Sequence, residues 1–276
     1  LATRWFGFYV FQHMVGMRFC SILLLLYVSD VSQGAVKPEH IINDPDAKKI
    51  QVIEDIALQR KLGAQMALYM QALRPVGAIS GKGELRFRAL KGTRKTVKLQ
   101  FRAFTVGATM VNEYKINEGV LTIKQKIGQD TQYEWTGAEK KVERLDENQA
   151  TRPFANSDFW MVDLGLEMLR WPHQSVIKRE PRRRELCSVL VSRPAKAVQG
   201  RYSKVVSWVD EDSMGIIRAE LFDGEGRLLK IFEPKSFKKV DGQWHVKEME
   251  MRNEQANTRT SINFDLEKIP GTKNNK

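Results

Sequence analysis

The chain has 276 residues, of which 42% are hydrophobic and 28% are charged. This balance is ordinary for a folded globular protein and excludes an intrinsically disordered chain. The formal net charge of +12 at pH 7 points to nucleic acid, anionic lipid headgroups or an acidic protein as the class of partner.

An export signal is expected at the N-terminus. Met17 and Arg18 precede an apolar run over residues 19–28, and small and polar residues follow that run. This order is typical of a secretory signal peptide. The run is shorter than the ~20 residues of a membrane span. We expect the signal within residues 1–34, with Met17 or Met14 as its true start. The alternative is an uncleaved segment that anchors the protein in the inner membrane.

Export narrows the choice of partner and compartment. Cys20 lies inside the expected signal and Cys187 is the other cysteine of the chain, so an intramolecular disulfide is not expected in the mature protein. We expect a soluble periplasmic protein. Nucleic acid is then not an expected partner, and anionic lipid or an acidic protein fits the charge better.

A long amphipathic helix is expected next. Asp44-Pro45 is a helix start, because aspartate can cap the helix and proline suits its first turn. Apolar residues then recur at steps of three, four and seven as far as Leu73. The pattern predicts a helix over Asp46–Leu73, or two helices broken near Gly63.

Two runs of strands follow, separated by a short helix. Between residues 79 and 145, and again between 173 and 266, apolar and polar residues alternate with the period of two that half-buried antiparallel strands show. The first run predicts strands around Leu85–Ala89 and Val97–Ala103 and at Gly119–Ile127, Gln132–Thr136 and Val142–Leu145. The second run predicts strands at His173–Lys178, Leu186–Ser192, Tyr202–Val209, Ile216–Phe222, Arg227–Phe232, Phe237–Val240, Gln243–Met251 and Thr258–Leu266. Ser157 and Pro172 delimit an apolar segment that predicts a helix over Ser157–Trp171. The basic run Lys178–Glu185 reads as a turn, either a solvated loop or a docking patch.

The fold class is mainly β with some α. We expect a single, strongly curved antiparallel sheet of about eleven strands, with the long and the short helix on its concave face. No linker divides the chain. Residues 35–270 are expected to form one domain, followed by a disordered tail over residues 271–276.

The residue patterns do not indicate catalysis. Three histidines follow the expected signal, namely His40, His173 and His245, and none has the spacing of a metal ligand. Nucleophile-elbow and zinc-protease motifs are absent from the sequence. No catalytic residue, metal or cofactor is therefore predicted, and the expected function is not enzymatic.

Aromatic residues on the expected strands and short helix are the distinctive feature. A large sheet that curls over an apolar face either fills that face with side chains or encloses a ligand cavity. The alternatives for these residues are an ordinary core and the lining of such a cavity. The candidates for the lining are Phe87, Phe101, Trp135, Phe159, Trp160, Leu164, Trp208 and Trp244.

A sequence signature stands in the second half of the chain. Residues 157–164 read Ser-Asp-Phe-Trp-Met-Val-Asp-Leu. This resembles the Ser-Asp-Phe…Asp-Leu signature of the outer-membrane lipoprotein-sorting family, whose periplasmic carriers are LolA-like and LolB-like. Further elements follow in order as far as residue 267: Trp171-Pro172, Cys187, Tyr202–Asp210, Ala219–Asp223, Gly226–Lys230, Gly242-x-Trp244, Met249-x-Met251 and Thr258–Thr260.

The resemblance implies an unclosed β-barrel lidded by helices over a hydrophobic cavity. It further implies a monomeric carrier that accepts the acyl chains of lipids or lipoproteins from an inner-membrane release complex and passes them to an outer-membrane acceptor, without a cofactor. Family carriers use a buried arginine to hold the lid closed, and the strand pattern gives no position for it here. The alternative is a structural or signalling module with the same fold that binds a protein partner and carries no lipid.

The short helix is the candidate lid. Trp160 and Leu164 would plug the empty cavity and move aside when acyl chains enter. The alternative is a helix that is packed permanently in the core.

Overall fold

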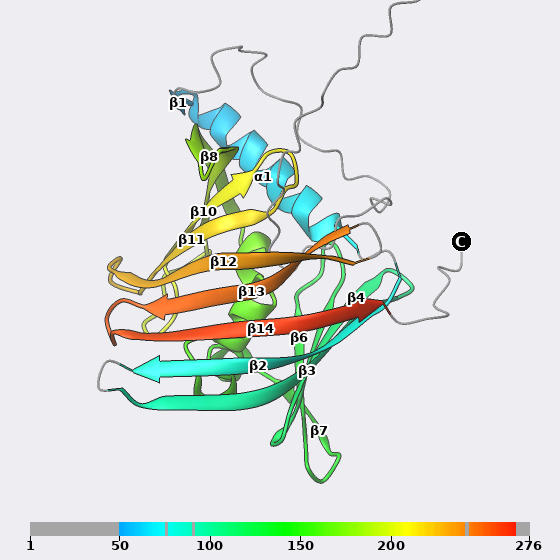
Figure 1. Cartoon of the computed structure of the whole chain (residues 1–276). Coiled ribbons are helices and arrows are strands. Elements are labelled where there is room, and N and C mark those ends of the chain that lie inside the picture. The colour runs from blue at the N-terminus through cyan, green and yellow to red at the C-terminus, as the bar shows by residue number, and fades with distance from the viewer. Residues whose placement is uncertain (1–49, 75–76, 90–91, 241–242, 269–276) are drawn as a thin grey trace, which may run out of the picture.

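The computed structural model describes residues 50–74, 77–89, 92–240 and 243–268, without the side chains of residues 240, 243 and 244. These residues form one large antiparallel sheet with a few helices in its curve (Figure 1). The expected signal, the expected tail and the start of the expected long helix lie outside the described residues. Within the described ranges, no helix combines the length and apolar character needed to span a membrane.

The fourteen strands have the spatial order β1-β8-β9-β10-β11-β12-β13-β14-β2-β3-β4-β5-β6-β7. Their bounds are β1 Gln51–Val52, β2 Ile79–Ala89, β3 Arg94–Val106, β4 Thr109–Ile116, β5 Gly119–Gln125, β6 Gln132–Gly137, β7 Val142–Leu145, β8 His173–Arg182, β9 Glu185–Arg193, β10 Lys204–Asp210, β11 Ile216–Phe222, β12 Leu228–Val240, β13 Gln243–Asn253 and β14 Thr258–Lys268.

The curved, unclosed antiparallel sheet confirms the expected fold class, but the expected number of about eleven strands was wrong. The edge strand β1 was not anticipated. Strand β4 was missed because Met110, Val111 and Asn112 are buried in succession, which hides the alternation. Strand β12 runs on through Pro234, where two strands were expected; the register shifts there, and such a bulge accommodates a residue that has no N–H to donate.

Helix α1, Ile56–Ala72, begins later than expected. Its N-cap is Asp55, whose carboxylate accepts hydrogen bonds from the backbone N–H groups of Ala57 and Leu58 at 2.8 and 3.2 Å. This cap satisfies two of the donors that the first turn leaves free. The predicted helix was therefore wrong over residues 50–55, where Gln51–Val52 pairs with β8 as a strand instead.

Helix α1 continues unbroken through Gly63 and packs against β8. A Cβ atom on Gly63 would lie only 2.4 Å from the backbone nitrogen of Ser175. The glycine therefore permits the backbones of the helix and of β8 to approach closely. The alternative of two helices broken at this residue is excluded.

Gly63→Ala should therefore destabilise the protein, although alanine favours a helix. The added methyl group meets the backbone of β8 at Ser175, where β8 is paired with β9, and such overpacking typically costs about 1–3 kcal/mol. Urea unfolding measures the change. Gln65→Ala, at an exposed position of α1, is the control and should change the free energy of unfolding by less than ~0.5 kcal/mol. Equal stability of the two variants would contradict the close contact.

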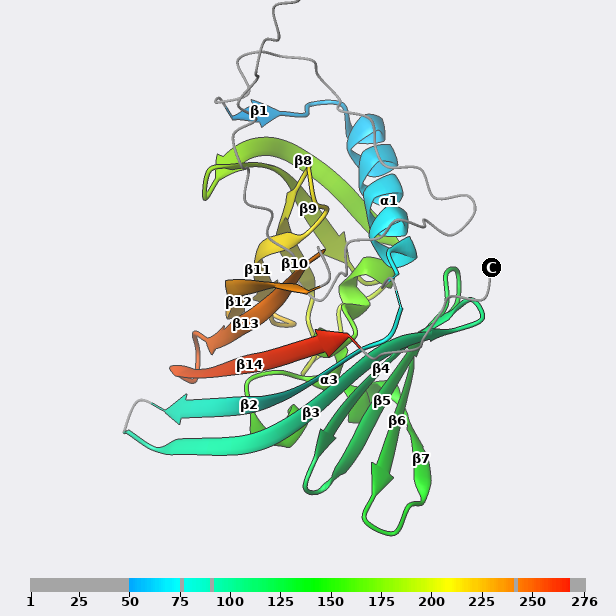
Figure 2. The same ribbon diagram turned by 45° about the vertical axis from the view of Figure 1, so that its right-hand side comes forward.

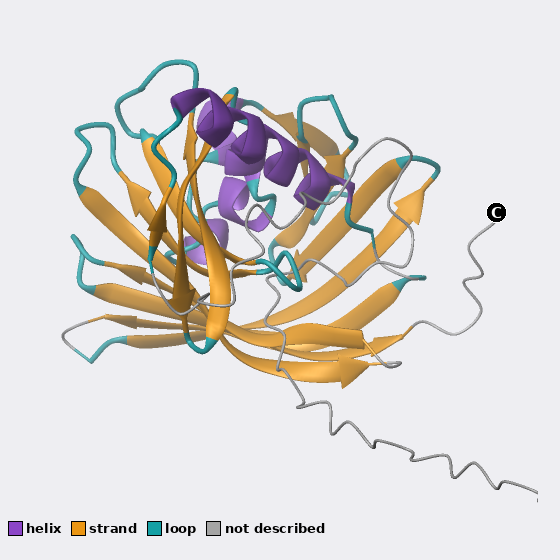
Figure 3. Ribbon diagram, turned by 90° about the horizontal axis from the view of Figure 1, so that it is seen from above, coloured by secondary structure: helices purple, strands orange, loops and turns teal. Residues whose placement is uncertain are grey.

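The chain crosses the concave face of the sheet between β7 and β8, because these strands lie at or next to opposite edges. We call residues 146–172 the crossing segment. It contains the short helices α2 Glu147–Ala150, η1 Phe154–Asn156, α3 Met161–Leu164 and η2 Glu167–Arg170. Figure 3 shows the helices within the curve of the sheet.

The single helix predicted over Ser157–Trp171 was wrong in its continuity. The segment breaks between α3 and η2, where Leu166 takes a left-handed backbone conformation with φ of 49°. Gly165, just before it, lies against Tyr133, since a Cβ there would be 2.3 Å from the tyrosine hydroxyl. Close packing on β6 therefore turns the chain at this point. Two short turns can follow the curved sheet where one straight helix could not.

One main hydrophobic core joins the helices to both runs of strands. Leu62, Met66 and Met70 of α1 contribute to it, together with Phe154 and Phe159 of the crossing segment. A second, smaller cluster of Cys187, Val189, Trp208 and Ile217 is separate from this core. Figure 2 shows the bend of the sheet from β8 through β14 to β7.

Candidate functional site

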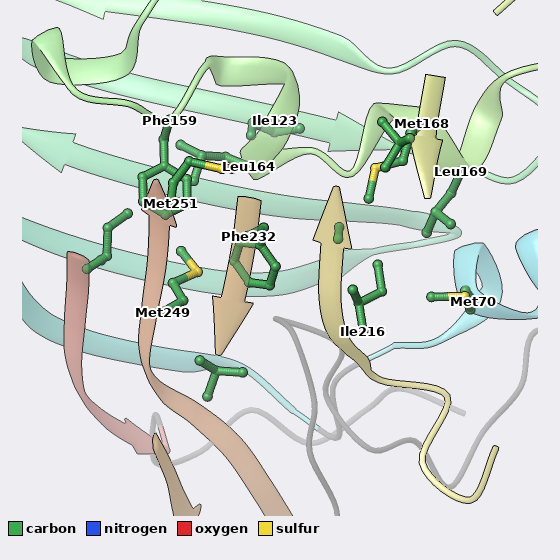
Figure 4. Close-up of a cluster of buried hydrophobic side chains, with 14 of the residues drawn as sticks. Met70, Ile123, Phe159, Leu164, Met168, Leu169, Ile216, Phe232, Met249 and Met251 are labelled. Carbon is green, nitrogen blue, oxygen red and sulfur yellow. The ribbon is translucent and has the colours of Figure 1, made fainter. Parts of the chain in front are cut away.

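A small apolar cavity lies between the crossing segment and the middle of the sheet. Its volume is about 30 Å³. Figure 4 shows side chains of the crossing segment and of the strands converging on this region. The lining residues are Phe159, Asp163, Leu164, Leu166, Met168, Ala219, Leu221, Phe232, Met249 and Met251.

The start of the Ser-Asp-Phe signature is bonded to β14. The Asp158 carboxylate accepts hydrogen bonds from the hydroxyls of Thr258 and Thr260 at 2.5 and 2.8 Å, and its own N–H donates to Thr260 Oγ1 at 3.0 Å. Asp158 is 6% exposed, so these bonds compensate for burying a carboxylate. Phe159, the next residue, is thereby directed into the core.

The second acid of the signature, Asp163, forms a buried ion pair with Lys230 of β12. The distance between Lys230 Nζ and Asp163 Oδ2 is 3.3 Å, and the two side chains are 1% and 5% exposed. The same oxygen accepts hydrogen bonds from the backbone N–H of Trp160 at 2.8 Å and from the Tyr202 hydroxyl at 3.2 Å. One carboxylate thus connects the crossing segment to β12, through Lys230, and to Tyr202 just before β10.

Two aromatic rings cover the ammonium group. Trp160 and Tyr202 stack with ring centroids 4.4 Å apart, and Lys230 Nζ lies 3.8 Å from the centroid of the tryptophan ring. Such cation–π contacts favour the charged amine. Burial acts in the opposite direction and is the larger effect: it lowers the pKa of Lys230 to about 8, against the opposing influence of Asp163 and Asp158.

Further polar contacts hold the end of the crossing segment. Gln174 of β8 donates to the carbonyl groups of Met168 and Trp171, both at 2.8 Å. Gln125 of β5 donates to the carbonyl group of Gly165 at 2.5 Å. Tyr133 of β6 donates to Glu167 at 3.0 Å. The segment is therefore bonded both to β8, near one edge of the sheet, and to β5 and β6, near the other edge.

Lys230→Met should destabilise the fold by about 3–5 kcal/mol, because it leaves Asp163 as a buried charge without its cation. Lys230→Met combined with Asp163→Asn should be less destabilised than Lys230→Met alone, since asparagine keeps an acceptor for Trp160 and Tyr202 but carries no charge. Urea unfolding of the two single variants and the double variant measures the coupling free energy.

The exposed pair of Arg86 and Glu84 serves as the control for this cycle. Its side chains are 60% and 43% exposed, so Arg86→Met should change stability by no more than ~1 kcal/mol. Additive effects of the Lys230 and Asp163 substitutions would show that the buried pair is not coupled.

The lowered pKa of Lys230 predicts a rise in stability with pH. Its folded pKa of about 8 lies below the ~10.4 of an unfolded lysine, so the unfolded chain binds more protons between these values. The free energy of unfolding contributed by this group therefore rises above pH 8, by at most ~1.4 kcal/mol per pH unit. The difference in the free energy of unfolding between wild type and Lys230→Met, measured from pH 7 to 9.5, should show this slope. Parallel stability curves of the two proteins would contradict it.

The structure brings some of the predicted lining residues together and separates others. Phe159 and Leu164 line the cavity, and Trp160 packs beside them over Lys230. Phe101 is buried elsewhere in the main core, with its ring 5.0 Å from that of Tyr114. Trp135 is half-buried against the same core.

The remaining candidates lie away from the cavity. Phe87 is half-buried on β2. Trp208 belongs to the second cluster, where its indole N–H donates to Glu180 at 2.5 Å and the Arg182 guanidinium lies 4.3 Å from the ring. Trp244 is in β13, and its side chain is outside the described residues.

The sequence analysis missed Lys230, Tyr202 and the two methionines Met249 and Met251 as site residues. A signal for Lys230 was present. It stands two residues before Phe232 in a strand, so the period of two places both on the same inward face. A lysine at a buried position requires a partner. The inward position of Lys230 therefore indicates a buried ion pair, although not the identity of its partner.

A larger hollow lies on the other face of the sheet. It is a groove of about 700 Å³ that is lined mainly by polar and charged side chains of both signs, among them Lys82, Arg102, Glu113 and Asp265. Such a lining does not suit an acyl chain. Among the described residues there is no group of histidine, cysteine or acidic side chains that could hold a metal ion.

Several solved structures share this fold. Among solved structures, a DUF1329 family protein from Desulfovibrio piger matches with a TM-score of 0.67 and 20% identity over 78% of this chain and 95% of its own. An outer membrane lipoprotein-sorting protein domain from Vibrio parahaemolyticus matches with a TM-score of 0.67 and 20% identity, over 78% of this chain and 96% of its own. A LolA superfamily protein from Nitrosomonas europaea matches with a TM-score of 0.54 and 17% identity, over 76% of this chain and 94% of its own. These likenesses confirm the LolA-like fold that the resemblance implied.

A family assignment comes from the sequence itself. Residues 113–269 match the model of a family described as "Uncharacterized protein", and because this is more than half of the chain, the protein belongs to that family. A search of the curated proteins gives no match.

Proposed function

We propose that the protein is a non-enzymatic periplasmic carrier that shelters the acyl chains of a lipid or lipoprotein between the crossing segment and the sheet. The observation that carries the proposal is the apolar cavity beneath the crossing segment in a LolA-like fold. Acyl chains crossing water need their apolar surface covered, and each Å² so buried contributes ~25 cal/mol.

The described state is the closed one. A cavity of about 30 Å³ is far smaller than ligand sites, which are typically about 300–1,000 Å³. Loading therefore requires the crossing segment to move off the strands as a lid, and Phe159 and Leu164 vacate their places in the core. The apolar surface of β11, β12 and β13 that this movement uncovers then receives the acyl chain.

The side chains on the strand side suit a variable occupant. Met249 and Met251 both lie on the inward face of β13, and Met251 is opposite Phe232 of β12. Methionine is unbranched and polarizable, so it can repack around ligands of different shape. This lining favours apolar chains in general over one specific ligand.

The second candidate is a module that binds a protein partner and carries no lipid. The observation in its favour is the same small cavity, since the protein's own side chains already fill the interior. The polar contacts along the crossing segment also favour a permanently packed segment. An experiment on lipid content separates the two functions.

Native mass spectrometry of protein purified from the periplasm tests the proposal. The carrier is expected to retain acyl species and, after delipidation, to take up a fluorescent fatty acid. Protein that is free of lipid and takes up no fatty acid would support the second candidate. The same measurement on Trp160→Ala tests the lid.

Trp160→Ala should raise the rate of fatty-acid uptake, because it removes the ring that stacks on Tyr202 and covers Lys230. Trp160 is only partly buried, so its loss should cost less than the ~3–5 kcal/mol of a buried tryptophan. Trp208→Ala is the matched control: it removes an indole from the separate second cluster and should leave the uptake rate unchanged. Equal uptake rates of wild type and Trp160→Ala would contradict the lid.

A further inference from the structure

A row of four arginines crosses the outer face of the sheet. The strand registers place Arg94 of β3 opposite Arg88 of β2, Arg88 opposite Arg259 of β14, and Arg259 opposite Arg252 of β13. Residues directly opposite in register share a face, and neighbouring strands are ~4.8 Å apart, so the row spans roughly 14 Å. We call these four residues the arginine row.

The row lies on the face away from the core. Phe87, one residue before Arg88, is opposite Thr260 on the inward face, where Thr260 is fully buried and bonds to Asp158. Arg88, Arg94 and Arg259 are exposed, and Arg252 is half-exposed. The row stands at one end of the sheet, where the hairpins β2–β3 and β13–β14 lie side by side (Figure 1).

Stability of the fold does not explain the row. Like charges directly opposite on neighbouring strands are destabilising, and here three successive pairs are Arg–Arg. Arg218 of β11 is neutralised by contrast: it pairs with Glu220 and with Glu233, both at 2.8 Å.

Carboxylates compensate the row only at one end. Arg252 lies 3.3 Å from Glu254, and Arg259 lies 4.0 Å from Glu250. In the part of the chain that the structure describes, no carboxylate pairs with Arg88 or Arg94. The row thus holds two uncompensated guanidinium groups next to two weakly compensated ones.

We propose that the arginine row is a docking surface for a membrane that contains anionic phospholipid. Guanidinium groups stay charged at every pH the protein meets, and each can bind a phosphate group with two parallel hydrogen bonds. The four strands are interior strands of the sheet, so their backbone groups are already paired and cannot add a peptide strand. Recognition through side chains alone fits a layer of phosphate headgroups.

The inference rests in one step on the proposed function, because a carrier of acyl chains must reach a membrane to load or unload. The row would hold the protein at the surface during transfer. Attraction to an anionic surface contributes a factor of about five in affinity for each arginine near it, and it weakens as salt screens the charges.

Co-sedimentation with vesicles tests the proposal. Full-length mature protein should bind vesicles of phosphatidylglycerol and phosphatidylethanolamine, should bind phosphatidylcholine vesicles much less, and should dissociate as salt is raised. Arg88→Gln with Arg94→Gln should weaken binding on the order of 25-fold without lowering the melting temperature, since it removes repulsion. Arg60→Gln with Lys61→Gln, two exposed positions of α1, is the control of equal charge loss and should bind as wild type.

Unchanged vesicle binding by the Arg88 and Arg94 variant, or equal loss in the control, would overturn the proposal. The proposal would also be overturned if the wild-type protein did not bind anionic vesicles but bound an acidic polypeptide, such as polyglutamate, through the same arginines. Uptake of a fluorescent fatty acid separates this result from the proposed function. Charge-dependent vesicle binding without uptake would reject the carrier and keep the docking surface, and uptake without such binding would do the reverse.

Discussion

The crossing of the concave face is the constraint on which the interior depends. Strand β7 is one edge of the sheet and β8 is next to the other, so the chain between them has to traverse the curve. Whatever lies there must be apolar toward the strands, yet its irregular backbone needs hydrogen-bond partners away from water. The strands supply these partners through side chains, with Gln125 and Gln174 donating to its carbonyl groups.

The signature of the crossing segment acquires a physical meaning from this arrangement. Its two apolar members, Phe159 and Leu164, fill the core, and the acid that precedes each of them bonds to the sheet. Asp158 uses neutral hydroxyl groups, which hold the segment without a buried charge pair. Asp163 uses Lys230, and a buried pair of this kind specifies one position of the segment while contributing little net stability. The interior is therefore closed by contacts that favour specificity over strength.

The sequence predicted the architecture better than the site. Alternating residues in β2, β3 and β14 indicated half-buried strands, because each has one face in the core and one in water. β4 was missed because its buried residues are consecutive, and α1 was extended too far because Asp44-Pro45 resembles a helix start that Asp55 in fact provides.

The pairing of distant strands explains why the site was harder to predict. Trp208 was a reasonable candidate by type, but a bulge between Trp208 and Val209 and the register of β10 place it in the second cluster. Lys230, Asp163 and Tyr202 meet only because the crossing segment lies over β12 and the start of β10. No local pattern contains that juxtaposition, although the inward position of Lys230 was visible in its own strand.

The position of β14 has a consequence for the order of folding. This strand pairs with β13 on one side and β2 on the other, so it joins the strands β2–β7 to the strands β8–β13. Residues 258–268 thus pair with residues 79–89 across most of the chain, and contacts of such long range form slowly. Until they form, each half of the sheet presents an open edge that invites pairing with other chains. The last strand of the sheet is thus the closing element of folding, and the interval before it is inserted is when the protein is most exposed to aggregation.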